Sequence, residues 1–336
     1  MKLHLVLTVW PVTKGNHAGM YYLAKQIQET LGCKVSIHKI PVFNNGHLYF
    51  VSRLYAILLG FYLRLITNKD DIVWLMEYLL RSTEQSDIAR VLKGHTRLFG
   101  IAHLVPEMIQ SQYSDNEMVD KINYLDKLYV LGSSLKKFFI SKGVKDEKIC
   151  VTYHYVDTNF YQYDTSKRED DISVICMGNM KRNYDDLQAI VKGCPDLHFI
   201  ICCGLHDLKP KFKDFNNVTL VGYVTEDELR CLMQSASISL NVMNDTIGSN
   251  VIVSSLATGL PVVASNVGSI CDYVTNKKDG MLFKNNEEAI EQLNFLVKNP
   301  YFIQELSDNA RKKAETISLQ NFISFITQDM NMACNE

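Results

Sequence analysis

The hydrophobic positions along the chain form short apolar runs that alternate with longer segments in which apolar residues recur every three or four positions. Short runs bounded by Gly, Pro or polar turns are typical of buried parallel strands, and the longer spacing is typical of helices that cover a sheet. The alternation of the two patterns predicts an α/β protein. It occurs as two successive series, which predicts two domains of this kind.

The first series extends to about residue 157. Its predicted strands are Lys2–Trp10, Lys34–Ile40, Asp71–Met76, Thr96–Ala102, Leu128–Leu131 and Lys148–Tyr153. Its predicted helices include Met20–Leu31, Gln85–Lys93 and Ser133–Lys142. Ser133 or Ser134 is predicted to cap the last of these helices.

The second series begins at about residue 171, after a polar stretch, Gln162–Asp171, that is predicted to link the domains. Its predicted strands are Ile172–Met177, Leu197–Cys203, Val218–Val221, Ser237–Val242, Pro261–Ser265 and Met281–Phe283. Its predicted helices are Tyr184–Lys192, Thr225–Gln234, Asn250–Thr258, Glu287–Lys298 and Tyr301–Thr316, followed by a last helix, Leu319–Met332. Thr225 and Glu228 have the spacing of a capping box.

The segment His47–Ile66 is unusually apolar and aromatic. Arg53 and Arg64 interrupt it, so the uncharged run between them is about half of the roughly 20 residues that a spanning helix requires. We therefore expect a helix that does not cross a membrane. Two interpretations remain: a buried crossover helix of the first domain, or a helix in the plane of a membrane surface with Tyr, Phe and Arg at the level of the lipid headgroups.

The composition is that of a globular protein, with 47% hydrophobic and 21% charged residues and a formal net charge of −2. This net charge argues against a nucleic-acid-binding protein. The first 160 residues carry 19 Lys and Arg against 14 Asp and Glu, and the remainder carries 16 against 23. A basic first half suits an anionic membrane surface or a phosphorylated acceptor, and unequal charge on solvated faces is an equally good explanation.

The cysteines and the start of the chain indicate a cytoplasmic protein. None of the nine cysteines forms a C-x-x-C pair, and several lie inside apolar runs such as Ile200–Cys203. We interpret them as reduced thiols rather than a disulfide frame or a zinc site. The apolar start, Lys2–Trp10, is followed at once by Pro11 and a Gly-containing loop, as in a first buried strand, so we expect no secretory signal.

The stretch Asn244–Val274 carries the most specific pattern of the chain. A loop with Gly248 leads into a predicted helix, Gly259 ends that helix, and an apolar β-branched strand follows. In an open α/β sheet, ligands lie beyond the carboxyl ends of the strands, where helix N-termini present unpaired N–H groups to an anion. The pattern therefore indicates a site for a phosphate-bearing ligand.

This stretch resembles the nucleotide-sugar loop of GT-B glycosyltransferases, in particular retaining family 4. The residues that match are Asn250–Val253, Ala257–Ser265 and Gly268-Ser269. Less specific matches, at Asp126, Val156-Asp157 and Phe160, extend the resemblance over nearly the whole chain. Where the family has Asn-Gly before this last group, the chain has His154-Tyr155.

The resemblance implies a GT-B fold, in which two Rossmann-like domains face each other across a cleft. Residues 1–157 would form an acceptor-side domain and residues 171–317 a nucleotide-sugar domain, and a helix over residues 318–336 would cross back to the first domain. In the first domain, Gly19 resembles the second glycine of the family's glycine loop, which lines the cleft. His103 resembles a histidine at the mouth of the cleft, placed to bind a sugar hydroxyl or to stabilise charge at the anomeric carbon. A histidine that simply bonds a neighbouring loop is the alternative.

In the second domain the family places an Arg and a Lys on the donor diphosphate, after its first strand. Here the run begins Gly178-Asn179 and is one residue shorter. In register, Arg182 takes the Lys position, Asn179 replaces the Arg, and Lys181 is a substitute for it. The resemblance therefore implies that Lys181 and Arg182 neutralise the charge of the leaving diphosphate.

The donor loop departs from the family at its two glutamates. In register, the second glutamate falls at Ser254 and the first at Thr246, and Asp245 lies one residue away. Ser254 has one hydroxyl where a carboxylate accepts two hydrogen bonds, so contact with the ribose is expected to weaken or move, and Asp245 is a candidate for the missing carboxylate. The amides of Gly248, Ser249, Asn250 and Val251 and the Asn250 side chain are expected to meet phosphate or sugar. No Asp pair of the kind that holds Mg²⁺ occurs, so a metal-free site without a further cofactor is expected.

The sequence thus predicts a retaining, metal-independent glycosyltransferase that moves a sugar from a nucleotide-sugar donor to a glycan or lipid-linked acceptor. The expected setting is cell-envelope or capsule polysaccharide synthesis in the cytoplasm, with peripheral attachment to the inner membrane face. Two alternatives remain. One is a nucleotide-sugar epimerase of the same fold, and the other is a non-catalytic partner protein that has lost the pair of glutamates.

Overall fold

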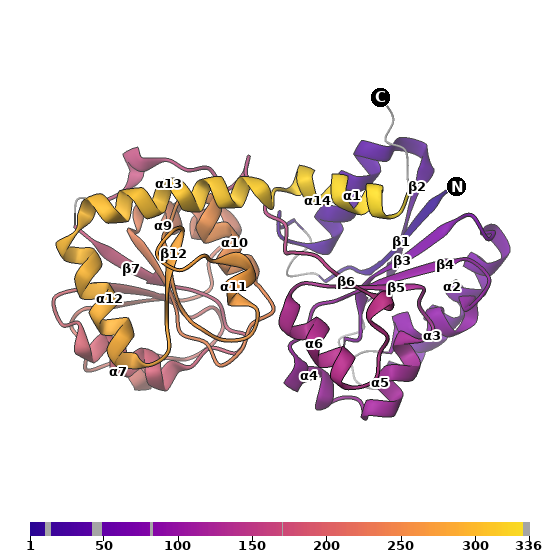
Figure 1. The fold of residues 1–336 in the computed structure, drawn as a ribbon, viewed down its shortest axis with the longest axis horizontal. Coiled ribbons are helices and arrows are strands. Elements are labelled where there is room, and N and C mark those ends of the chain that lie inside the picture. The colour runs from indigo at the N-terminus through magenta and orange to yellow at the C-terminus, as the bar shows by residue number, and fades with distance from the viewer. Residues whose placement is uncertain (11–14, 42–48, 81–82, 170, 332–336) are drawn as a thin grey trace. The chain divides into compact units, whose positions relative to one another are not determined.

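The computed structural model of the chain describes residues 1–10, 15–41, 49–80, 83–169 and 171–331. The chain divides into two compact units, one formed by Met1–Tyr153 with Phe322–Glu336 and the other by His154–Asn321. Each unit contains a six-stranded parallel sheet with helices packed on it (Figure 1). The two sheets confirm the predicted α/β class.

The sheet of the first unit has the strand order β2-β1-β3-β4-β5-β6. Its strands are β1 (Leu3–Thr8), β2 (Val35–Ile40), β3 (Ile72–Tyr78), β4 (Arg97–Ala102), β5 (Lys127–Val130) and β6 (Ile149–Val151). Its helices are α1 (Met20–Leu31), α2 (Tyr49–Ile66), α3 (Glu84–Leu92), α4 (Pro106–Gln110), α5 (Asp115–Ile122) and α6 (Ser133–Ser141). Strand β3 is buried along its whole length because it lies inside the sheet, between β1 and β4.

The C-terminal helix α14 (Leu319–Asp329) ends on this first sheet. Asp329 accepts hydrogen bonds from Lys127 Nζ at 2.7 Å and from the Tyr129 hydroxyl at 2.6 Å, both on β5. The ring of Phe322 packs edge-on against Tyr153. The chain therefore closes the first unit with its last helix, and Met332, the predicted end of that helix, lies outside the described residues.

The sheet of the second unit has the order β12-β11-β10-β7-β8-β9. Its strands are β7 (Ser173–Cys176), β8 (His198–Cys202), β9 (Val218–Val221), β10 (Ile238–Asn241), β11 (Val262–Ser265) and β12 (Gly280–Phe283). Its helices are α7 (Tyr184–Gly193), α8 (Lys209–Phe212), α9 (Glu226–Ser235), α10 (Asn250–Ala257), α11 (Ile270–Tyr273), α12 (Asn286–Lys298) and α13 (Pro300–Thr316). The order reverses between β10 and β7, and the loops at such a reversal commonly form the ligand site of an open sheet.

Local details differ from the sequence predictions in two places and agree with them in a third. Helix α6 begins directly after Gly132, which occupies the N-cap position, so the prediction that Ser133 or Ser134 caps it is wrong. The predicted capping box of Thr225 and Glu228 on α9 is confirmed. The stretch predicted as a linker, Gln162–Asp171, lies within the second unit, because Tyr163 donates to Asp308 at 2.8 Å and Arg168 donates to the Gly259 carbonyl at 2.6 Å.

The cysteines of the described residues are all free thiols. Four of them are buried at β7, β8 and the end of α7, as predicted for core thiols: Cys176, Cys194, Cys202 and Cys203. Cys33, Cys231 and Cys271 are exposed instead, and Cys334 lies outside the described residues.

Helix α2 combines features of both predicted interpretations. Ser52, Ala56 and Leu63 are buried, and the helix packs on α3 as a crossover helix. The other side is exposed and apolar, and consists of Phe50, Val51, Leu54, Tyr55, Leu58, Phe61, Tyr62, Leu65 and Ile66. None of the helices in the described ranges combines the length and hydrophobicity needed to span a bilayer. Residues 47 and 48 of the predicted segment lie outside those ranges.

The arginines of α2 face the protein. Arg53 Nε lies 2.8 Å from Asp87 Oδ2 on α3, and Arg64 Nη1 donates to the Val91 carbonyl at 3.0 Å. Both side chains keep exposed surface, so the interpretation that places these arginines at lipid headgroups stays a prediction. They attach α2 to α3 and leave the apolar side outward.

Two histidines form a direct contact between the first two strands of the sheet. His4 Nδ1 lies 3.0 Å from Nε2 of His38 on the edge strand β2, and His4 is 3% exposed. Burial lowers the pKa of His38 to about 4 and also lowers the pKa of His4. One ring must donate and the other accept, so the contact requires at least one of the two imidazoles to be neutral.

This pair predicts acid sensitivity of the first unit. In the unfolded chain His38 is protonated below about pH 6.5, whereas in the folded unit it stays neutral down to about pH 4. The free energy of unfolding is therefore expected to fall as the pH drops from about 6.5 to about 4. Replacing His38 with Asn should make that fall shallower. Both tryptophans, Trp10 and Trp74, lie in the first unit, so urea unfolding followed by tryptophan fluorescence at several pH values measures this unit alone.

A His206→Asn variant, altered at an exposed histidine of the second unit, is the control. An identical pH slope for the wild type and His38→Asn would show that the pair does not titrate as argued.

Candidate functional site

The loop after β7 turns sharply and then bonds to the loop after β10. Gly178 has φ +84° and Lys181 has φ +54°. The Lys181 carbonyl accepts from Asn244 N–H at 2.9 Å, and Asn183 N–H donates to Val242 O at 3.0 Å. Asn183 then caps α7, since its side chain accepts from Asp186 N–H. These bonds hold residues 178–183 beside the carboxyl ends of β7 and β10.

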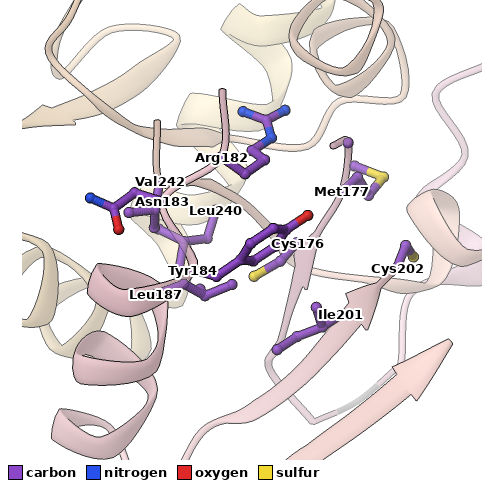
Figure 2. A pocket seen from close by; sticks show the side chains of 11 residues that line it. Cys176, Met177, Arg182, Asn183, Tyr184, Leu187, Ile201, Cys202, Leu240 and Val242 are labelled. Atoms are coloured by element: carbon purple, nitrogen blue, oxygen red, sulfur yellow. The ribbon is translucent and has the colours of Figure 1, made fainter. Parts of the chain in front are cut away.

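Arg182 follows on this loop and lines a pocket at the ends of β7, β8 and β10, with its guanidinium directed away from the Tyr184 ring in Figure 2. Its Nε and Nη1 atoms are buried and have no hydrogen-bond partner among the described residues. Burial lowers the pKa of the guanidinium to about 10, so the group remains a cation at neutral pH. A buried cation without a partner destabilises the folded state, because neither water nor a counter-charge replaces its hydration. The arrangement therefore favours binding of an anion.

Three of the predicted donor residues come together around Gly178. A Cβ atom at this glycine would lie 2.7 Å from Arg182 Nη2 and 3.1 Å from Val251 Cγ2. The guanidinium and the first turn of α10 thus share one narrow space. Any side chain at position 178 would displace Arg182, and the positive φ adds a second reason for glycine.

The N-terminus of α10 supplies backbone donors to the same region. Ser249 is the N-cap, and its hydroxyl accepts from Ile252 N–H at 3.3 Å. Asn250 and Val251 are the first two helical residues, so their amides have no partner within the helix. Asn250 is exposed. These amides and the helix dipole complement the cation of Arg182, since both attract negative charge.

The loop that leads into α10 is held by its own polar groups. Gly248 N–H donates to the Thr246 hydroxyl at 3.1 Å, and Ser269 N–H donates to the Thr246 carbonyl at 2.7 Å. Asp245 accepts from Thr246 N–H at 2.7 Å and lies against Gly268, where an added Cβ would overlap it. Asp245 thus lies in the loop that precedes α10 and braces that loop with one of its oxygens.

The remaining donor-side predictions lie farther from Arg182 or are bonded internally. Ser254 is buried, and its hydroxyl donates to the Asn250 carbonyl at 2.6 Å, which uses its one hydrogen within α10. Asn179 is exposed and turns toward Gly204, whose added Cβ would lie 2.9 Å from Asn179 Nδ2. The predicted contacts of Ser254 with ribose and of Asn179 with phosphate stay predictions.

In the first unit, Gly19 and His103 lie at the carboxyl ends of β1 and β4. Gly19 is the N-cap of α1 with φ −82°, an extended conformation that any residue adopts. Residues 11–14 of its predicted loop lie outside the described residues. His103 Nε2 lies 2.8 Å from the Met76 carbonyl, which fixes Nε2 as the donor and Nδ1 as the accepting nitrogen. Burial lowers the pKa of His103, which favours the neutral ring.

Two tyrosines of the site were missed by the sequence analysis. Tyr184 lines the Arg182 pocket, and its hydroxyl is buried without a partner among the described residues. Tyr273 lies against Gly248, and its hydroxyl accepts from His154 N–H at 2.9 Å. Both occupy variable positions of the family pattern, so no motif marked them.

Within the described ranges, no group of three or more His, Cys, Asp or Glu side chains could hold a metal ion.

The Tyr273 ring packs so closely on Gly248 that a side chain at position 248 is expected to destabilise the second unit. Gly248 has φ +93°, and a Cβ there would overlap the tyrosine ring. Gly248→Ala is expected to lower the free energy of unfolding of the second unit by about 2–4 kcal/mol. The second unit contains no tryptophan, so tryptophan fluorescence reports unfolding of the first unit only. Far-UV circular dichroism reports both units, and the transition seen by circular dichroism alone belongs to the second unit. Gly222→Ala is the control, because nothing lies within 4 Å of its added Cβ. Equal melts of the two variants would contradict the argument.

Comparison with known proteins finds a family match within the second unit. Residues 171–299, which contain the Arg182 loop and α10, match the family described as Glycosyl transferases group 1. No curated protein matches the amino-acid sequence.

Solved structures share the fold over nearly the whole chain at low identity. HepE of Anabaena in complex with UDP is similar over 98% of this chain and 100% of its own, with 16% identity and a TM-score of 0.75. Sucrose-phosphate synthase of Thermosynechococcus elongatus covers 98% of each chain with 11% identity and a TM-score of 0.76. The galactosyltransferase WaaB covers 98% and 99% with 13% identity and a TM-score of 0.71. Residues 171–299 therefore match the glycosyl transferases group 1 family, and the chain as a whole shares the GT-B fold of these solved structures.

Proposed function

We propose that this protein transfers a sugar from a UDP-sugar to a glycan or lipid-linked acceptor. The observation that carries the proposal is the buried guanidinium of Arg182, unpaired at Nε and Nη1, beside Gly178 and the first turn of α10. A glycosyl donor of this kind leaves as a nucleoside diphosphate, which needs fixed positive charge as the bond to the sugar breaks. Arg182 and the α10 amides supply such charge without reorganisation.

Roles for the other donor residues follow from their positions. Lys181 lies next to Arg182 on the same turn and adds a second cation for the diphosphate. Ser249, Asn250 and Val251 bind phosphate or sugar through the start of α10. Asp245 replaces a family glutamate only in part, because one of its oxygens already accepts from Thr246. We therefore expect weaker ribose contact than a glutamate pair would give.

The choice of UDP is supported by the similar proteins. Structures of HepE of Anabaena hold UDP, UDP with glucose, and UDP-glucose. At 13–16% identity these proteins share the fold, so the base and the sugar of the present donor are part of the proposal.

On the acceptor side, we propose that neutral His103 contacts the sugar. Its Nε2–H is held by the Met76 carbonyl, and a neutral ring is what the lowered pKa favours. Transfer with retention, and a place in cell-envelope or capsule polysaccharide synthesis on the cytoplasmic side, follow from the family resemblance. Gly19 starts α1 at the carboxyl end of β1, where an acceptor or donor phosphate would approach.

We further propose that α2 attaches the protein to the membrane that carries a lipid-linked acceptor. Phe50, Leu58, Phe61 and Leu65 are each more than half exposed, a density of large apolar side chains that water disfavours. Aromatic and aliphatic residues on one side of a helix are typical of interfacial attachment. Because Arg53 and Arg64 are bound to α3, burial of this apolar side supplies most of the attachment, and other basic residues of the first unit add attraction to anionic lipid.

The donor proposal is tested with Arg182→Gln, which keeps most of the side-chain size and removes the charge. We expect the affinity for UDP, measured by calorimetry, to fall by about 10–100-fold, because hydrogen bonds to charged groups contribute about 1.5–3 kcal/mol. Lys298→Gln, at an exposed position at the end of α12, is the control. An unchanged affinity in Arg182→Gln would refute the phosphate assignment.

Transfer itself is tested by release of UDP from UDP-sugars with and without a mixture of glycan and lipid-linked acceptors. Release that requires an acceptor is expected for a transferase. Conversion of one UDP-sugar into its epimer without an acceptor would indicate the epimerase, and binding without turnover would indicate a non-catalytic partner.

Membrane attachment is tested by flotation with anionic and neutral liposomes at low and high salt. The wild type is expected to float with anionic vesicles at low salt, and Phe61→Glu with Leu65→Glu should abolish flotation, since two charges would enter the apolar interface. Tyr301→Glu is the control, because Tyr301 is 91% exposed on α13 of the second unit. Absence of wild-type flotation with anionic vesicles at low salt would discard this proposal.

A further inference from the structure

We infer that Tyr184 is a donor-binding residue whose hydroxyl, together with the guanidinium of Arg182, holds one oxygen of the donor diphosphate. This inference rests on the proposed function. It adds a neutral hydrogen-bond donor to a site that family resemblance assigns only to basic residues, the α10 loop and the two glutamate positions.

The first observation is that Tyr184 and Arg182 present unsatisfied groups to the same pocket. The Tyr184 hydroxyl and the two Arg182 nitrogens are buried and lack partners among the described residues, and both side chains line the pocket at the end of β7 (Figure 2). An unpaired buried hydroxyl is destabilising, and a phenylalanine would fill the same volume without that penalty. The hydroxyl is therefore explained by a partner that binds there.

The second observation is the chemistry of the pocket lining. Its other side-chain heteroatoms are mainly the sulfurs of Cys176, Met177 and Cys202, which are weak acceptors. Asn183 also lines it, but its amide is committed to Asp186 and Asn244. The pocket thus offers hydrogen-bond donors and positive charge and few acceptors, which selects an anionic oxygen over a neutral polar group.

The third observation is size. The pocket has room for about one water molecule, so it accommodates a single oxygen atom and not a whole phosphate group. We therefore expect the rest of the diphosphate to lie outside it, toward Gly178 and the start of α10. One inserted oxygen would accept a hydrogen bond from the phenol and one from the guanidinium.

The fourth observation is that the hydroxyl is held in a defined position. Tyr184 is the first residue of α7, and its ring packs partly against the core of the second unit. Its centroid lies 6.4 Å from that of His206, on the loop after β8. The two nearby carboxylates are bound elsewhere, Asp185 by Lys211 and Asp186 by Asn183 and Asn286, which reduces their repulsion of an anion.

The test is Tyr184→Phe, which removes only the hydroxyl. Calorimetry with UDP, UMP, uridine and inorganic pyrophosphate is compared for the wild type and the variant. We expect UDP and pyrophosphate affinity to fall by about 5–20-fold, as for loss of one hydrogen bond to a charged group, and uridine affinity to stay unchanged. Tyr301→Phe, at an exposed tyrosine of α13, is the matched control.

A double-mutant cycle with Arg182→Gln separates a shared oxygen from independent effects. If both residues hold one oxygen, the loss in Tyr184→Phe should be several-fold smaller when Arg182 is already replaced. Equal losses in both backgrounds would overturn the shared site.

The remaining outcomes also decide the inference. Unchanged UDP and pyrophosphate affinity in Tyr184→Phe overturns it, as does a loss with uridine as large as with UDP, which would place Tyr184 on the nucleoside. Wild-type protein that binds pyrophosphate but not UDP would refute the proposed donor and still test Tyr184 through pyrophosphate. Wild-type protein that binds neither would refute both.

Discussion

The candidate site of the second unit is organised around the guanidinium of Arg182, a cation buried at the end of β7 without a counter-charge among the described residues. Burial lowers the pKa of Arg182 and leaves two of its nitrogens unsatisfied, so the loop must be held in place by other contacts. The Lys181 carbonyl and the Asn183 amide bond to the segment after β10, and Asn183 also caps α7. Backbone hydrogen bonds thus hold a side chain in a position that its own electrostatics disfavours, which is typical of functional sites.

The same constraint explains the glycines and tyrosines around the site. Gly178 leaves space for the guanidinium beside Val251, and Gly248 leaves space for the ring of Tyr273 under the donor loop. Tyr273 accepts a hydrogen bond from His154, at the position where the family has Asn-Gly. The altered residues at 154 and 155 therefore coincide with a contact that joins the start of the second unit to the donor loop.

The two sheets could be predicted from the sequence because their apolar runs are short, buried and bounded by turns, and most predicted strands lie within a few residues of the observed ones. Short helices such as α4 and α8 escaped prediction, since four or five residues give too few turns for a periodic pattern. The basic pair at 181–182 was visible as a motif. Tyr184 was not, because its significance lies in an unsatisfied hydroxyl, which only packing reveals.

Helix α2 illustrates a pattern that the sequence could not resolve. A nearly all-apolar helix is expected to be buried, and its arginines suggested contact with lipid. In the structure, Arg53 and Arg64 bond to α3 while Phe61 and Leu65 are exposed. Periodicity could not assign the faces, since apolar residues occur all round the helix, and contacts with α3, such as that of Arg53 with Asp87, determine which side turns inward. The exposed side is an apolar surface that the stability of the unit does not explain, which favours a membrane or a partner that covers it.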